Sequence, residues 1–237
     1  MTETRTENAV PTHKPRPLID LLVSIVAPSV ILMKFSGDEH LGAAAALVAA
    51  LAFPISWGTF ELVRYRKFNF IALLGLISVI LTGGIGLLKI DPQWLAVKEA
   101  AIPGIIGLAV LGSTFTRYPL VRTLLYNPAI LNTERIQERL IAGGNLARFE
   151  LRLLHANHLL AGTFGFSAVM NYVLARWIVT SEAGSAAFNE ELGRLTLVSY
   201  PMIAIPSMLM MIGIFWFLWR TIKGLTGLDL EEILVHK

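Results

Sequence analysis

Six long apolar runs constrain this chain more than any other feature of its sequence. Each is close to the roughly 20 mostly apolar residues that a helix needs to cross a bilayer. Because a bilayer offers the backbone no water to bond with, a crossing segment must satisfy its own hydrogen bonds, as a helix does. The sequence therefore predicts an all-α polytopic membrane protein built as a six-helix transmembrane bundle. The predicted helices cover 18–35, 41–63, 68–88, 92–115, 153–179 and 195–219.

The composition agrees with a membrane protein and excludes several other classes. Hydrophobic residues make up 54% of the chain and charged residues only 16%, whereas a soluble domain is about 25% charged. The net charge is +3, but the basic residues are scattered between apolar runs, so we expect no nucleic-acid partner. The chain has no cysteine, which excludes disulfides, thiolate metal sites and a cysteine nucleophile.

The distribution of basic residues predicts the orientation of the bundle. If both termini are cytoplasmic, fifteen of the 20 lysines and arginines fall on the cytoplasmic side. Such an excess follows the positive-inside rule and needs an even number of crossings. We therefore expect a multi-pass membrane protein with both termini in the cytoplasm. The five basic residues left for the outer side are Lys34, Lys89, Lys98, Arg176 and Arg194.

Three regions follow from this topology. Residues 1–17 are polar and predict a disordered cytoplasmic tail. The transmembrane domain covers 18–222 and includes a long cytoplasmic loop at 116–152. Residues 223–237 form a weakly amphipathic C-terminal segment, which we expect near the membrane.

The cytoplasmic loop contains a short amphipathic helix in the stretch NTERIQERLIAGG. Ile136 and Leu140 share one face, with Arg135 and Arg139 beside them. Such a helix could lie on an anionic inner leaflet, or it could be a solvated connector.

Small residues recur at helical spacing in the second and third predicted helices. Because lipid tails are as apolar as leucine, such smooth faces let two helices approach closely. We expect these faces to meet each other or a second copy of the chain in a homo-oligomer; a hinge, or backbone lining a cavity, is the alternative. The expected packing residues are Gly42, Ala46, Ala50, Gly75, Gly83, Gly84 and Gly86.

Two charges, Lys98 and Glu99, lie inside the fourth predicted helix. A charge at the centre of a membrane helix costs about 2.5 to 3.5 kcal/mol, so partners should offset it. Pro103 also leaves the carbonyl of Glu99 without its helical donor. The arrangement fits either a structural ion pair or a transport site. The candidate polar cluster is Lys98, Glu99, Asn171, Arg176 and Arg194.

No motif in the chain indicates enzyme chemistry. His155 and His158 share a helical face, but no carboxylate or cysteine joins them at the spacing of a metal site. Metalloprotease, nucleophile-elbow and phosphate-loop motifs are absent from the sequence. We therefore expect no catalytic residue, no metal and no cofactor.

Two stretches of the chain resemble a known family. In RKFNFIALLGLISVILTGGIGLLKIDPQWLAVKEAAIPGIIGLAVLGSTFTRYPLVRTLLYN, a basic turn precedes a helix that ends near a Gly-Gly pair. An acidic turn, an early lysine in the next helix and a basic-Pro-Leu step follow. This pattern, with MNYVLARWIVTS and FNEELGRLT, resembles the bacterial intracellular septation protein A family and its inner-membrane relatives. The chain differs from short members in its longer middle loop, proline-rich sixth helix and longer tail.

The resemblance implies a non-enzymatic inner-membrane protein that supports the cell envelope or septation. Its partners would be the lipid bilayer and envelope or division proteins. The alternative is a small transporter or channel for an ion or a lipid, which would use the polar cluster around Glu99.

Overall fold

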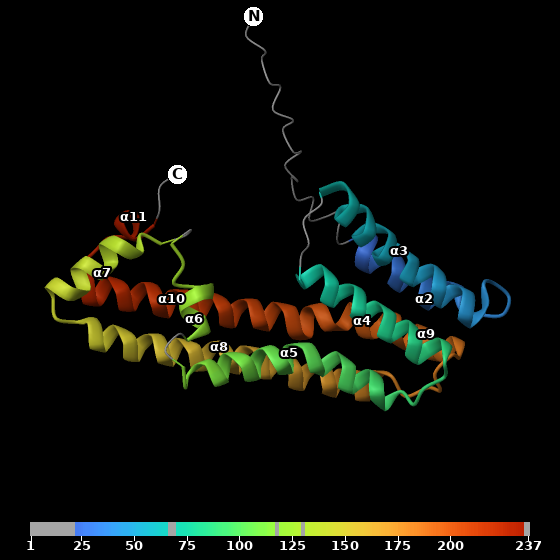
Figure 1. Cartoon of the computed structure of the whole chain (residues 1–237). Coiled ribbons are helices and arrows are strands. Elements are labelled where there is room, and N and C mark those ends of the chain that lie inside the picture. Colours follow the sequence, from blue (N-terminus) through green and yellow to red (C-terminus); the bar gives the residue numbers. More distant parts are fainter. Residues whose placement is uncertain (1–21, 66–69, 117–118, 129–130, 235–237) are drawn as a thin grey trace, which may run out of the picture. The chain divides into compact units, whose positions relative to one another are not determined.

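The computed structural model describes residues 22–65, 70–116, 119–128 and 131–234. Every named element in these ranges is a helix (Figure 1), and one isolated bridge pairs Leu131 with Leu234. The elements are η1 (Leu22–Val26), α2 (Ala27–Phe35), α3 (Gly42–Tyr65), α4 (Phe70–Leu87), α5 (Gln93–Ser113), α6 (Leu120–Leu124), α7 (Thr133–Ala142), α8 (Leu146–Ile178), α9 (Ala186–Ser199), η2 (Tyr200–Ala204), α10 (Ile205–Thr226) and α11 (Leu230–Ile233).

Three helical segments are long and apolar enough to cross a membrane: Gln93–Ser113, Leu146–Ile178 and Ala186–Thr226. Gly42–Ser56 and Ile77–Leu87 are shorter apolar helices. The last two long segments begin earlier than the sequence predicts. Hydropathy finds the apolar part of a helix, but a helix continues into polar sequence as long as its backbone hydrogen bonds do.

The described residues form two compact units, and these do not follow the three regions expected from the sequence. The first unit contains the chain up to Lys98 together with Leu174–Val198. The second contains Glu99–Val173 and the chain from Ser199 onward. The predicted tail, 1–17, lies outside the described residues.

In the first unit, α2 packs on α3 and α3 packs on α4. Ala46 and Ala50 of α3 are fully buried. A Cβ added at Gly86 of α4 would lie 2.4 Å from Leu47 Cδ2, and one added at Gly83 would lie 2.6 Å from Leu51 Cδ1. These four small residues therefore lie where α3 and α4 come close.

Two other glycines expected to pack, Gly84 and Gly42, do not act in this way. Gly84 has open space beside it, with no atom within 4 Å of an added Cβ, because it lies on a different face of α4 from Gly83 and Gly86. Gly42 also has nothing within 4 Å, but its φ of +74° is one that favours glycine. Its role is to turn the chain into α3. The surroundings of Gly75 lie outside the described part of the structure.

Another close helix contact in the first unit involves a residue that the sequence did not suggest. A Cβ added at Gly193 of α9 would lie 2.8 Å from the Ser29 carbonyl oxygen and 2.7 Å from Met33 Cγ. The backbone of α2 therefore approaches α9 directly. A single glycine in a polar stretch gives no repeat from which this contact could be predicted.

In the second unit, α7 and α11 pack against α10, as Figure 1 shows. We call α6, α7 and α11 the helical cap. Ile136 and Leu140 of α7 are fully buried in the core, as are Leu228 and Ile233 near the C-terminus. The apolar stripe of α7 thus contacts protein, which corrects the expectation of a helix lying on the inner leaflet. The segment after Lys223 likewise packs into this core.

Replacing Gly193 by alanine should destabilise the protein, because the new methyl group meets the backbone of α2. Overpacking of this kind costs about 1 to 3 kcal/mol. Gly213→Ala is the matched control, since nothing lies within 4 Å of its added Cβ and both changes raise helix propensity equally. Thermal unfolding in detergent should show a lower Tm for Gly193→Ala and an equal or higher Tm for Gly213→Ala. Equal melting of the two variants would contradict the contact.

Candidate functional site

The predicted polar cluster begins at Lys98, whose partner lies within the first unit. Lys98 Nζ donates a hydrogen bond of 2.8 Å to Thr82 Oγ1, and Thr82 in turn donates to the Ser78 carbonyl of its own helix. Lys98 therefore links α5 to α4 through a half-buried polar contact. Thr82 directly precedes Gly83 and Gly84, two of the glycines expected to pack.

The other members of the predicted cluster lie in different surroundings. Glu99 is half-buried in α5. The Asn171 side chain donates a 2.8 Å hydrogen bond to the Ser167 carbonyl of its own helix. Arg176 and Arg194 are exposed. The pairing of Glu99 with Arg176 or Asn171 stays a prediction.

A polar centre that the sequence did not predict lies in the second unit, at Asn157 of α8. This side chain is fully buried. Its amide nitrogen lies 2.7 Å from the Val110 carbonyl oxygen and 3.1 Å from the hydroxyls of Ser113 and Thr114. Its oxygen accepts a 3.0 Å hydrogen bond from the Val121 backbone N–H. One amide thus joins the end of α5, the start of α6 and the middle of α8.

Asn157→Leu should destabilise the protein, because it leaves the Val121 N–H without its acceptor in a buried place. An unsatisfied buried group costs about 1 to 3 kcal/mol. Asn171→Leu is the control, since the Asn171 amide bonds only within its own helix. We expect a clearly lower Tm in detergent for Asn157→Leu than for Asn171→Leu. A similar small loss in both variants would show that the Asn157 bonds are replaceable.

A groove of about 890 Å³ lies between the first turns of α8 and the last turns of α10. This volume falls within the ~300 to 1,000 Å³ of typical small-molecule sites. Asn145, just before α8, donates a 2.9 Å hydrogen bond to the Leu225 carbonyl and so holds the two walls together. The side chains with hydrogen-bonding or aromatic groups in its lining are Arg148, Arg152, His155, Trp216, Phe217, Arg220 and Thr221.

The charged side chains that line this groove are basic. Its lining contains three arginines and no carboxylate. Within the described part of the chain, none of the three arginines forms an ion pair. Two of them lie over aromatic rings: Arg220 Cζ is 5.4 Å from the Trp216 ring centroid, and Arg152 Cζ is 6.0 Å from that of Phe217. These two guanidinium groups therefore have cation–π contacts, which leave their N–H donors available for hydrogen bonds.

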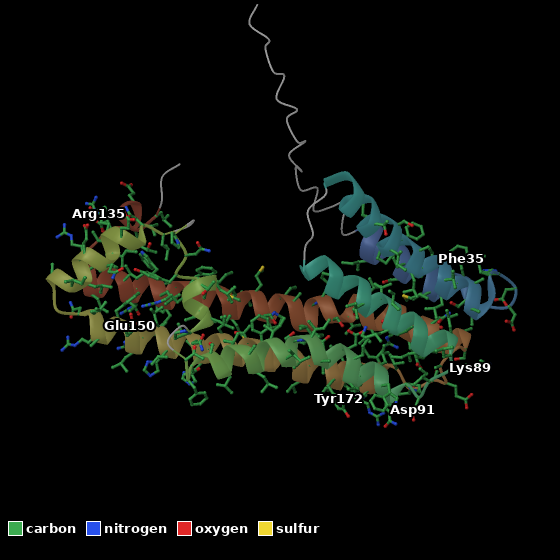
Figure 2. All side chains as sticks on the ribbon, viewed as in Figure 1. Phe35, Lys89, Asp91, Arg135, Glu150 and Tyr172 are labelled. Atoms are coloured by element: carbon green, nitrogen blue, oxygen red, sulfur yellow. The ribbon has the colours of Figure 1, made fainter. Side chains whose placement is uncertain are left out.

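Several other basic residues of the second unit form ion pairs. Arg122 bonds to Glu150 and Arg135 of α7 bonds to Glu232 of α11; Figure 2 labels Glu150 and Arg135. Beside the first pair, burial raises the pKa of Tyr126 to about 12, so this phenol stays neutral at physiological pH. Its hydroxyl donates to the Thr133 carbonyl at 3.3 Å. These contacts hold the helical cap together and leave the groove as the basic surface.

The sequence contained a signal for the groove. Arg148, Arg152 and His155 are spaced i, i+4 and i+7, and Trp216 and Arg220 are spaced i, i+4, so each set lies on one helix face. The sequence did not indicate that α8 packs against α10. The two histidines noted in the sequence lie in different surroundings. His155 lines the groove, while His158 Nδ1 lies 2.8 Å from the Leu154 carbonyl oxygen. Among the described residues, no group of three or more histidine or carboxylate side chains could hold a metal ion.

No protein-family model, curated protein or solved structure matches this chain significantly. The contacts and charges of its own residues therefore carry the functional argument.

Proposed function

We propose that the chain is a non-enzymatic, multi-pass protein of a bacterial inner membrane that supports the cell envelope through lipid or protein partners. It would cross the membrane six times, with both termini in the cytoplasm. The link to the envelope and to septation rests on the resemblance to the septation protein A family. The mode of action rests on the basic groove.

Contacts within the first unit support an even number of crossings. The turn after α8 lies against the turn after α4, because a Cβ at Gly184 would be 3.0 Å from the Gly86 carbonyl oxygen. The start of α9 lies against the turn after α2, because Asn189 donates to the Ala43 carbonyl at 2.7 Å and to Ser36 Oγ at 3.1 Å. All three turns are therefore at one end of this unit, as alternating crossings require.

Contacts within the second unit support the same topology. Asn157 joins the carboxyl end of α5 to α8, and Asn145 joins the start of α8 to the end of α10. The ends of α5 and α10 and the start of α8, which are expected in the cytoplasm, therefore lie close to the helical cap.

The single observation that carries the proposed mode of action is the unpaired basic lining of the groove. Three arginines without a carboxylate, two of them over aromatic rings, form a surface suited to an anionic partner. Arginine is preferred for such recognition because its planar fork matches carboxylate and phosphate oxygens.

Transport of an ion or lipid is the second candidate, and the Lys98–Thr82 contact favours it. A lysine bonded to a threonine inside an apolar region, one residue before Glu99 and close to Pro103, places polar groups along α5. Ionisable residues of this kind often mark transport pathways. A structural role in joining α4 to α5 explains the same contact.

The proposed topology predicts which positions an impermeant thiol reagent reaches in intact cells. Because the chain has no cysteine of its own, each single-cysteine variant reports one position. Asp38→Cys and Glu182→Cys should react from outside the inner membrane, and Glu138→Cys should react only after permeabilisation. All three side chains are exposed, so access within the fold is matched. Labelling of Glu138→Cys in intact cells would overturn the proposed orientation.

A complementation experiment separates the two candidate functions. Cells lacking the chain should show an envelope defect, scored as detergent sensitivity. Under the proposed function, Glu99→Gln restores resistance, whereas the double variant Arg152→Gln/Arg220→Gln does not. Transport predicts the reverse: Glu99→Gln fails and the arginine variant succeeds. Immunoblots of the membrane fraction ensure that only variants present at wild-type amounts are compared.

A further inference from the structure

We propose that the basic groove between α8 and α10 binds the phosphate headgroup of an anionic phospholipid, whose acyl chains lie along α10. The proposal rests on the proposed membrane location and deepens it by naming the partner of this surface. It requires three properties: a phosphate site, an adjoining apolar path and selectivity over other basic surfaces.

The groove has the chemistry of a phosphate site. Arg148, Arg152 and Arg220 converge on it from two helices, and all three are exposed. Guanidinium groups bind phosphate oxygens through paired N–H donors. Thr221 adds a hydroxyl to the lining. Basic pockets between membrane helices on the cytoplasmic side are suited to anionic headgroups.

An apolar path leads from the groove along α10, which distinguishes a lipid from a soluble phosphate. Large apolar side chains are exposed on one side of the helix and end at Trp216, one turn before Arg220. Their spacing of three and four residues keeps them on a single stripe. Trp216 is 54% exposed, and tryptophan favours the boundary between headgroups and hydrocarbon. The stripe consists of Ile205, Met208, Leu209, Ile212, Phe215 and Trp216.

A second groove in the same unit has the opposite charge. It lies between α7 and α11 and is lined by Glu134, Glu231 and Glu232 but by only one arginine, Arg135, which pairs with Glu232. An anion would be repelled there. The attraction for anionic lipid is thus concentrated at the α8–α10 groove and is not spread evenly over the unit.

The shape of the groove allows a variant that blocks it without removing charge. Gly224 lines the groove, and a Cβ added there has nothing within 4 Å. Gly224→Leu would therefore extend into the groove and leave all three arginines in place. Arg139→Gln is the matched charge control, because Arg139 is an exposed arginine of α7 outside the groove.

The test measures thermal unfolding of the purified full-length protein in detergent. Titrated additives are phosphatidylglycerol, phosphatidylcholine and inorganic phosphate. We expect phosphatidylglycerol to raise the Tm and the other two to leave it unchanged. Each of Arg152→Gln and Arg220→Gln should need about tenfold more phosphatidylglycerol for the same shift, as loss of a charge-assisted hydrogen bond implies. Gly224→Leu should abolish the shift, and Arg139→Gln should behave as wild type.

Several results would overturn the proposal. An equal shift with phosphatidylcholine would remove the role of the anionic headgroup, and an equal shift with inorganic phosphate would mean a soluble ligand. An equal loss in Arg139→Gln would indicate diffuse attraction instead of a site, and so would an undiminished shift in Gly224→Leu. Absence of any shift would refute binding. Because this measurement uses purified protein, its failure is distinguishable from failure of the cellular complementation that tests the proposed function.

Discussion

A buried asparagine amide holds the helix ends together in each unit. Asn157 joins α8 to α5 and α6, and Asn189 joins α9 to the turn between α2 and α3. In a lipid environment apolar contact between helices gains little over contact with lipid tails, so packing and hydrogen bonds must specify which helices meet. Asn157 bonds to the Val110 carbonyl in the last turn of α5 and to the Val121 N–H in the first turn of α6, where backbone groups lack partners within the helix. The first of these amides joins α6 of the helical cap to α8, and Asn145 joins the two walls of the groove.

Periodicity and hydropathy located the helices well because both depend on properties of single segments. The predicted range 92–115 corresponds to α5 at Gln93–Ser113, and the short helix predicted in NTERIQERLIAGG corresponds to α7 at Thr133–Ala142. The amphipathic stripe of α7 was also recognised, but its partner was not. Ile136 and Leu140 would look the same in sequence whether they face lipid or a protein core. Only the fold shows that α10 and α11 cover them.

The candidate site was harder to predict, because it depends on pairs of residues far apart in the chain. Arg152 and Phe217 are brought together by the packing of α8 with α10. Gly193 packs against α2, although one glycine between polar residues carries no pattern. Lys98 was recognised as a charge in an apolar run, but its partner, Thr82, was not predicted. A polar residue in an apolar run indicates that a polar partner exists, but the sequence does not identify that partner.

The length of α8 has a consequence for the depth of the groove. Its 33 residues extend ~50 Å at 1.5 Å per residue, well beyond the ~30 Å of bilayer hydrocarbon. In the proposed arrangement, the first turns of α8 therefore stand outside the hydrocarbon, joined rigidly to the part inside it. Bilayer thickness then sets whether Arg148 and Arg152 lie level with the lipid phosphates. A difference between the apolar length of α8 and the thickness of the hydrocarbon would therefore change how accessible the groove is to lipid headgroups. The protein itself would not need to change.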